Sequence, residues 1–340
     1  MDAIDSWLAM GETAIALATV IDTWGSAPRK VGAKMAFTTG GTAIAGSVSG
    51  GCVESAVIEA GDKVLATGRP QLLHFGVADE TAWGVGLACG GSIDVFVERL
   101  DLSLYAVTRE KIIAHDQVVI AAIVEGADEF TGRKLIVAGD EVTGTLGGVM
   151  DEQTLRLARQ SQRPVRFSPA EGITLFIDVV RPSPVLVIVG GAHIAVALAQ
   201  IARIIGYRTL IVDPRRAFGS EARFPGVDQI IPVWPEKAFA DMPIGPEMAV
   251  VTLSHDPKID DPALRAALQS EAFYIGALGS RKTHTARRTR LAAMGFTDAQ
   301  LARIHAPIGL DIGADNPEEI GLAIMSEIVA ANRQRVTEDE

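Results

Sequence analysis

The chain has 340 residues, of which 48% are hydrophobic and 21% are charged. This length exceeds that of one typical domain, so we expect two domains, each able to bury a core without disulfides or metal staples. The net charge of −11 repels phosphate backbones and argues against nucleic acid as a partner. The sequence shows neither an apolar run of membrane-spanning length nor a basic signal peptide, and two cysteines are too few for a disulfide scaffold. We therefore expect a cytoplasmic protein without a membrane partner.

Residues 1–180 are predicted to form an α+β domain with a degenerate internal duplication. The first copy has expected strands at 14–21, 31–38, 43–48 and 71–75, and a helix from about 52 to 67. The second has expected strands at 118–124, 134–138, 142–146 and 164–167, and a helix at about 151–159. Both copies place an Arg-Lys pair before the second strand, at 29–30 and 133–134, and a Gly-Gly pair before the helix.

The glycine turns of the two copies differ. Residues 46–54 of the first copy read GSVSGGCVE, whereas residues 144–151 of the second read GTLGGVMD, one residue shorter before the glycines and without a cysteine. A cysteine in one copy of a shared scaffold indicates that the first copy has the chemistry. The alternative is that Cys52 is a small buried hydrophobe at a helix start.

A helix that begins at about Cys52 leaves its first N–H groups unpaired, and these groups and the helix dipole stabilise an anion. Gly50 and Gly51, which follow Ser49, let the backbone come close to a ligand. The turn is therefore predicted to bind an anionic ligand or to favour Cys52 as a thiolate. Glu54 suits the positive end of the dipole, and it serves equally well as a structural cap.

Cys89 also lies beside a Gly-Gly pair, just before a strand expected at 92–97. The two cysteines are predicted to converge on one site, where they would bind a thiophilic centre, form a transient disulfide or hold a persulfide. Two ligands are too few for a structural zinc site. The alternative for Cys89 is a small residue in a tight turn.

From about residue 185 to 340 the sequence predicts a Rossmann-type parallel α/β domain, after a boundary of two prolines at 181–184. The start of this domain follows the dinucleotide-binding layout of strand, glycine turn, helix, strand and acid. These parts are a strand at 185–189, the turn Gly190-Gly191-Ala192, a helix to 205, a strand at 209–212 and Asp213. Ala192 stands where that layout has its second glycine, which weakens the prediction of NAD(P) binding.

Polar residues at predicted strand ends are further ligand candidates, because ligands bind outside the carboxyl ends of parallel strands. We expect His193 either to contact a ligand phosphate or to be simply a polar residue at a helix start. Arg215 is expected either to bind a 2′-phosphate or to pair with an acid on the surface. The other candidates are His255, Asp256, Ser280, Arg281 and Lys282, of which the last three suit a phosphate. Arg287, Arg288 and Arg290 are expected on a solvated helix face.

These motifs together resemble the XdhC/CoxI family, maturation factors for molybdenum hydroxylases such as xanthine dehydrogenase and carbon monoxide dehydrogenase. The matching segments span nearly the whole chain, at 47–54, 89–91, 190–195, 212–215, 223–225, 253–256, 274–282, 307–312 and 317–320. The family usually has Gly-Ala-Gly-His where this chain has GGAH at 190–193, and Thr-His-Asp where it has SHD at 254–256.

The resemblance implies that the protein binds molybdenum cofactor, as molybdopterin or its cytosine dinucleotide form. It also implies support for sulfuration of the metal, with a cysteine desulfurase as partner, and insertion into an apo molybdenum hydroxylase. We expect a homodimer that acts through a cleft between its two domains. Cys52 would be the molybdenum or sulfur ligand, with Cys89 in support. The following residues would hold the cofactor: Ser49, Gly50, Gly51, Glu54, Gly190, His193, Asp213, Arg215, His255, Asp256, Ser280, Arg281 and Lys282.

Two other functions remain open at this point. The Rossmann layout and Asp213 suit an NAD(P)-dependent oxidoreductase, although no residue stands out as a proton donor for hydride chemistry. The third hypothesis is a regulator without catalytic activity that senses a nucleotide.

Overall fold

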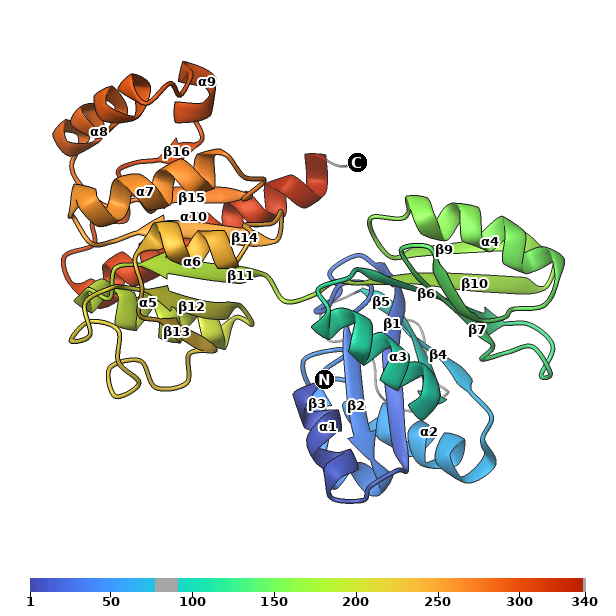
Figure 1. Cartoon of the computed structure of the whole chain (residues 1–340). Helices are drawn as coiled ribbons and strands as arrows, with labels where there is room; N and C mark the ends of the chain where they lie inside the picture. Colours follow the sequence, from blue (N-terminus) through green and yellow to red (C-terminus); the bar gives the residue numbers. More distant parts are fainter. Residues whose placement is uncertain (77–90, 339–340) are drawn as a thin grey trace. The chain divides into compact units, whose positions relative to one another are not determined.

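The computed structural model describes residues 1–76 and 91–338 (Figure 1). By their internal contacts the residues divide into two compact units, Met1–Pro182 and Ser183–Glu340. Each unit has its own sheets and its own hydrophobic core, and each is described separately below.

The first unit contains two five-stranded antiparallel sheets of the same design. The first copy consists of α1 (Asp2–Ala9), β1 (Ile15–Trp24), β2 (Lys34–Thr38), the short helix η1 (Thr39–Gly41), β3 (Ile44–Gly46), α2 (Glu54–Thr67), β4 (Gln71–Phe75) and β5 (Ser92–Arg99). The second consists of α3 (Leu102–Ile113), β6 (Val118–Glu125), β7 (Lys134–Ala138), β8 (Glu141–Gly144), α4 (Val149–Gln160), β9 (Val165–Ala170) and β10 (Ile173–Val180). The strand orders β3-β2-β1-β5-β4 and β8-β7-β6-β10-β9 correspond one to one, which confirms the duplication.

Helices α2 and α4 cover one face of their respective sheets, because each presents apolar residues to the inward-facing side of its strands. Gly61 of α2 lies so close to the ring of Phe37 that a Cβ there would collide with it. On the opposite faces the two sheets meet in a shared apolar cluster, which includes Ile21 and Phe96 from the first copy and Val124 and Phe176 from the second. The two copies are therefore joined by a common core.

Two ion pairs with buried carboxylates cross between the copies in a reciprocal manner. Lys34, the first residue of β2, contacts Asp178 of β10 at 2.5 Å, and Lys134, the first residue of β7, contacts Glu98 of β5 at 2.7 Å. The strand registers make these positions equivalent, because Glu98 lies opposite Leu17 and Asp178 opposite Ile120. Lys34, and not Lys30 as the sequence pattern suggested, is therefore the counterpart of Lys134.

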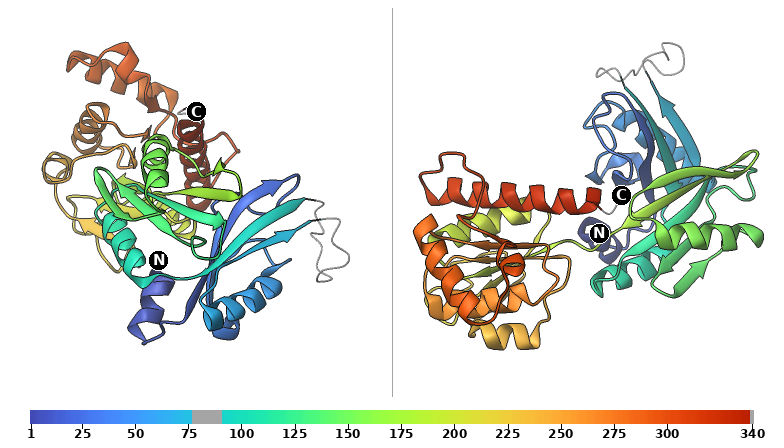
Figure 2. Two further views of the ribbon diagram at one scale, coloured as in Figure 1. Left: turned by 90° about the vertical axis from the view of Figure 1, so that its right-hand side faces the viewer. Right: turned by 90° about the horizontal axis from the view of Figure 1, so that it is seen from above.

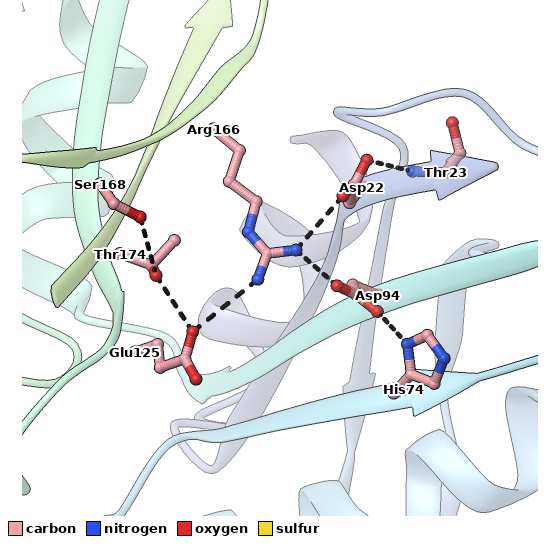
Figure 3. A network of polar contacts seen from close by, with 8 residues as sticks. All are labelled: Asp22, Thr23, His74, Asp94, Glu125, Arg166, Ser168 and Thr174. Carbon is pink, nitrogen blue, oxygen red and sulfur yellow. Dashed lines mark hydrogen bonds and ion pairs between the residues drawn. The ribbon is translucent and has the colours of Figure 1, made fainter. Parts of the chain in front are cut away.

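A polar network joins the sheets beside this core (Figure 3). Arg166 of β9 contacts Asp94 of β5 at 2.5 Å and Asp22 of β1 at 3.3 Å, and it approaches Glu125 of β6 at 3.8 Å. The Nδ1 atom of His74 lies 2.5 Å from the other oxygen of Asp94. One arginine of the second copy thus holds three carboxylates from both copies.

The second unit is a six-stranded parallel sheet in the order β13-β12-β11-β14-β15-β16. Its elements are β11 (Val185–Val189), α5 (His193–Ile204), β12 (Arg208–Val212), β13 (Gln229–Ile231), α6 (Pro235–Asp241), β14 (Met248–Thr252), α7 (Pro257–Leu268), β15 (Tyr274–Ala277), α8 (Arg281–Ala293), α9 (Asp298–Leu301), β16 (Ile304–His305) and α10 (Pro317–Glu338). This is the 3-2-1-4-5-6 order of the doubly wound dinucleotide-binding fold, so the predicted Rossmann architecture is confirmed.

Helices cover both faces of this sheet (Figures 1 and 2). Helices α5 and α10 pack on one face, and α6, α7 and α8 pack on the other. The strand order reverses between β11 and β14, which are parallel neighbours, so the glycine turn after β11 and the Ser254 turn after β14 meet at the carboxyl edge of the sheet. A Cβ at Gly190 would lie 2.7 Å from the Ser254 nitrogen, which shows how closely the two turns approach.

Candidate functional site

The glycine turn of the first copy links β3 to α2 and is held by one carboxylate. Glu54, the first residue of α2, accepts hydrogen bonds from the Ser47 hydroxyl at 2.7 Å and from the Ser49 and Gly51 amides, both at 2.9 Å. It also accepts a bond from the Ser49 hydroxyl. The helix begins here, two residues later than predicted, and the acid folds back over the turn that precedes it.

Burial raises the pKa of Glu54, but the hydrogen bonds from Ser49 and Ser47 outweigh it and lower the pKa to about 2. The Glu54 carboxylate is therefore ionised at neutral pH and acts as the anion of the turn. Two further amides of the turn are also bonded, since Gly50 donates to the Ser47 hydroxyl and Val53 to the Ser49 hydroxyl.

The second copy has the same arrangement without a cysteine. Asp151 accepts bonds from the Thr145 hydroxyl at 2.5 Å and from the Leu146 and Gly147 amides at 2.6 and 3.2 Å. Burial raises the pKa of Asp151, and these bonds lower it below its ordinary value. Because both copies share this carboxylate, its position is explained by the architecture of the turn.

The exposed thiol of Cys52 is what distinguishes the first turn. The alternative of a buried hydrophobe is wrong, since Cys52 lies at the surface. Gly50 and Gly51 adopt φ angles of 78° and 119°, and a Cβ at either would meet no atom of the described residues within 4 Å. Among these residues, the backbone conformation and not the space around it requires glycine.

Three connections gather at this end of the first sheet. The Cys52 turn follows β3, the connection of residues 25–33 joins β1 to β2, and Gly91 leads into β5. Arg29 donates to the Ser47 carbonyl at 3.3 Å, and a Cβ at Gly91 would lie 2.6 Å from the Trp24 carbonyl. Cys89 itself lies outside the described residues, two positions before Gly91.

In the second unit, Asp213 at the end of β12 is fully buried and bonded on both oxygens. It accepts from the Gly191 amide at 2.7 Å and from the Arg215 guanidinium at 2.9 and 2.7 Å. Burial raises the pKa of Asp213, and the Arg215 and Gly191 bonds lower it below its ordinary value. A ribose hydroxyl would have to displace Arg215 from this carboxylate.

The chain itself covers the glycine turn of the Rossmann unit. A Cβ at Gly191 would collide with the Phe218 carbonyl oxygen, and the Arg215 guanidinium lies 4.2 Å from the centre of the Phe218 ring. Arg223 donates to the Gly191 carbonyl at 3.1 Å. These contacts occupy the place where a pyrophosphate approaches the turn in dinucleotide-binding proteins, which disfavours the oxidoreductase alternative.

The other predicted residues lie around the carboxyl edge of the same sheet. His193 is exposed at the start of α5, whose first turn has no side-chain cap. His255 is exposed with a left-handed φ of 61°, and Asp256 caps α7 through the Lys258 amide at 2.9 Å. Ser280 caps α8, and Arg281 and Lys282 are exposed in its first turn.

The prediction of a solvated basic face on α8 is wrong for Arg287, which is 2% exposed. Its guanidinium lies 3.8 Å from Asp260 of α7, an acid that follows the SHD segment in the sequence but that no spacing rule pairs with Arg287. Arg290 is also bound, through two contacts of 2.6 and 2.8 Å to Asp261. The sequence shows the helical spacing of these basic residues, but it does not show which acids of α7 lie opposite them.

The residues that the structure describes contain no group of three or more His, Cys, Asp or Glu side chains placed to hold a metal ion. None of the helices in the described ranges is long and apolar enough to cross a membrane.

Comparison with known proteins gives a consistent result. Residues 7–76 match the model of the XdhC and CoxI family, and residues 186–328 match that of the XdhC Rossmann domain, which together make up more than half of the chain. A Bacillus subtilis protein named as a probable xanthine dehydrogenase subunit is 28% identical, with 97% of each chain covered. The molybdenum cofactor insertion chaperone PaoD of Escherichia coli is 28% identical over 92% of this chain and 82% of its own length.

A solved structure extends this likeness to three dimensions. The crystal structure described as a xanthine dehydrogenase from Bacillus halodurans aligns with a TM-score of 0.80 at 26% identity, covering 98% of this chain and 97% of that one. The chain therefore belongs to the XdhC and CoxI family, with the family's Rossmann domain as its second unit.

Proposed function

We propose that this protein is a maturation factor that carries molybdenum cofactor and inserts it into an apo molybdenum hydroxylase. The observation that carries the proposal is the comparison of the two glycine turns. Both are held by a carboxylate, and the first alone has an exposed thiol, at Cys52, where the second has Val149 in sequence. The names of the relatives, an insertion chaperone and a xanthine dehydrogenase subunit, support the same role.

The chemistry of the turn suits this cargo. A thiolate is a soft ligand that binds thiophilic metals, and no atom of the described residues lies within 4 Å of a Cβ at Gly50 or Gly51 to obstruct a bulky group. Arg29, whose guanidinium donates to the Ser47 carbonyl of the turn, supplies positive charge for an anionic group of the cargo. Glu54 is already bonded to the turn, so we assign it the task of holding Cys52 in place and not of binding the cargo.

Several finer points belong to the same proposal. Cys89 assists Cys52, because its sequence neighbour Gly91 packs against the same end of the first sheet. Sulfuration would use a persulfide on one of these cysteines, supplied by a cysteine desulfurase. In the second unit, we assign ligand binding to the polar residues at the carboxyl edge of the Rossmann sheet. We also propose that the protein is a cytoplasmic homodimer.

The test is purification of the chain from a molybdate-replete host that also expresses a molybdenum hydroxylase. We expect pterin and molybdenum to co-purify with the native chain. The Cys52→Ala variant should lose the metal and leave the hydroxylase inactive, with its stability unchanged because the thiol is exposed. Ser55→Ala, an exposed change in the first turn of the same helix, is the matched control and should behave as the native chain.

An active hydroxylase in the presence of Cys52→Ala would overturn the role of Cys52. Absence of pterin from the native chain as well would overturn the cofactor-carrier function itself.

A further inference from the structure

Arg287 of α8 is a buried cation whose bonding is incomplete. Its Nη2 atom donates to the Leu278 carbonyl at 2.8 Å and lies 3.8 Å from an oxygen of Asp260. The Nε and Nη1 atoms have no hydrogen-bond partner within the described part of the chain, and both are buried. An unsatisfied buried donor costs about 1–3 kcal/mol, so such groups are rare unless a ligand or water completes them.

Other unsatisfied atoms lie in the same region. They are Oγ1 of Thr252 at the end of β14 and Nδ1 of His284, one turn before Arg287 in α8. Thr252 is joined to the region through its carbonyl, which accepts from the Leu278 amide at 2.9 Å. Four of the five unsatisfied buried side-chain atoms found in residues 1–76 and 91–338 therefore cluster beneath the turn between β15 and α8.

Burial shifts the pKa values of two titratable groups near Arg287, Asp260 and His284. Burial raises the pKa of Asp260, although the Ser254 hydroxyl donates to it at 2.6 Å and Arg287 lies nearby. Burial and the charges of Arg287 and Arg288 lower the pKa of His284, so this imidazole is neutral at pH 7. The cluster is thus rich in donors and has one carboxylate.

Above the cluster, the turn that opens α8 is basic. Gly279 has a φ of 133°, Ser280 caps the helix through the Thr283 amide at 3.2 Å, and Arg281 and Lys282 form the first turn. Cations at a helix N-terminus oppose the helix dipole, and an anion there would be favourable for both. The turn also lies at the carboxyl edge of the sheet, the side on which such folds bind ligands.

We propose that the β15–α8 turn binds a phosphate group, with Arg281 and Lys282 in contact with it and Arg287 as the buried positioning residue beneath. The ligand class is a phosphate ester. The inference rests on the proposed function, since a pterin phosphate and the nucleotide phosphate of a dinucleotide form are the two sources of this chemistry.

The test measures the affinity of the full chain for inorganic phosphate and for cytidine monophosphate by calorimetric titration. The double variant Arg281→Ala, Lys282→Ala changes two exposed side chains and is expected to fold normally, while its Kd rises at least about tenfold. Arg288→Ala, on the same helix and paired with Asp298, is the matched control with unchanged Kd. Tighter binding of cytidine monophosphate than of phosphate would support the nucleotide as the source, and equal binding would support the pterin phosphate.

Arg287 is tested with a conservative pair. Arg287→Lys keeps the charge and should hold the Kd within about threefold, whereas Arg287→Gln should raise it at least about tenfold. A crystal structure in phosphate with one water on Arg287 and no anion in the turn would overturn the proposal, as would an unchanged Kd in the double variant. Neither result bears on the dependence of hydroxylase activation on Cys52, so the two proposals fail separately.

Discussion

The two copies in the first unit agree in architecture and differ in chemistry. Strand order, covering helix and the carboxylate that holds the glycine turn are common to both. The first copy adds a thiol at Cys52, and its connection between β4 and β5 runs over residues 76–91, whereas β9 and β10 are joined by residues 171–172. The Cys52 turn follows β3 and the longer connection follows β4, and these two strands terminate at the same end of the first sheet.

The second copy separates the functional features of the first copy from its structural ones. A feature present in both copies is explained by what the shared fold needs, as with Glu54 and Asp151. A feature present in one copy needs another explanation, as with Cys52. The second copy thus acts as an internal control for the first, and exchanges between them give sharp tests.

The largest expected effect comes from the reciprocal ion pairs. Lys134→Met leaves Glu98 buried without its partner and should lower the free energy of unfolding by about 3 kcal/mol. The equivalent Lys34→Met should cost about 1 kcal/mol, because the Lys34 side chain is 33% exposed against 11% for Lys134. Urea unfolding of both variants measures the difference, and equal losses would contradict the assigned burial.

The pH dependence of the Lys134→Met variant provides a second measurement. Burial raises the pKa of Glu98 above its ordinary 4.5, although Lys134 opposes this. A raised pKa in the folded state means that folding favours the protonated acid, so stability from this group is present at low pH and is lost as pH rises. Without Lys134 this loss should grow, so the variant should recover stability relative to the native chain as the pH falls from 7 toward 4.5.

The next effect concerns the carboxylates of the two turns. Glu54→Gln removes a charged acceptor of four hydrogen bonds and should cost about 2 kcal/mol at pH 7, whereas Asp151→Asn, with three bonds, should cost about 1 kcal/mol. The pKa of Glu54 is lowered from 4.5 to about 2, so its contribution is present above pH 4.5 and is lost as pH falls toward 2. Native and Glu54→Gln chains should therefore converge in stability at pH 2.

Denaturant unfolding from pH 7 to pH 2 tests this prediction, with co-purified pterin as a parallel readout. If Glu54→Gln kept full stability at pH 7 but lost the pterin, Glu54 would be a ligand and not a support for the turn.

Much of the fold follows from local pattern. The strands at 71–75, 134–138 and 185–189 were predicted with their observed bounds, because glycine, proline or charged residues end each apolar run. The strand β10 and the helices α1 and α3, which complete the duplication, were not predicted. Helix α3 has apolar contacts on several sides, and β10 is buried on both of its faces, so neither shows a clean periodicity.

The site was less predictable, because its contacts join distant positions. Lys34 and Asp178 are far apart in sequence, and no spacing rule pairs them. Arg287 has the spacing of an exposed helix residue, and its burial depends on Asp260 of another helix. The carboxylate of Glu54 was recognised as suited to the helix start, but the short-range bonds that bind it to Ser47 and Ser49 required the backbone of the turn.

The smallest expected effect comes from the polar network between the copies (Figure 3). Arg166→Gln removes the cation that Asp94, Asp22 and Glu125 share, and should lower the free energy of unfolding by about 1 kcal/mol, because Asp94 is largely buried while the other two acids are exposed. The loss should shrink in 1 M salt, where charges are screened beyond about 3 Å. Arg69→Gln is the matched control, because Arg69 also pairs with an acid of the other copy, Asp128. Both of these side chains are exposed, so we expect no measurable change in the free energy of unfolding. Equal losses in the two variants would show that the Arg166 network does not join the copies more strongly than a surface ion pair does.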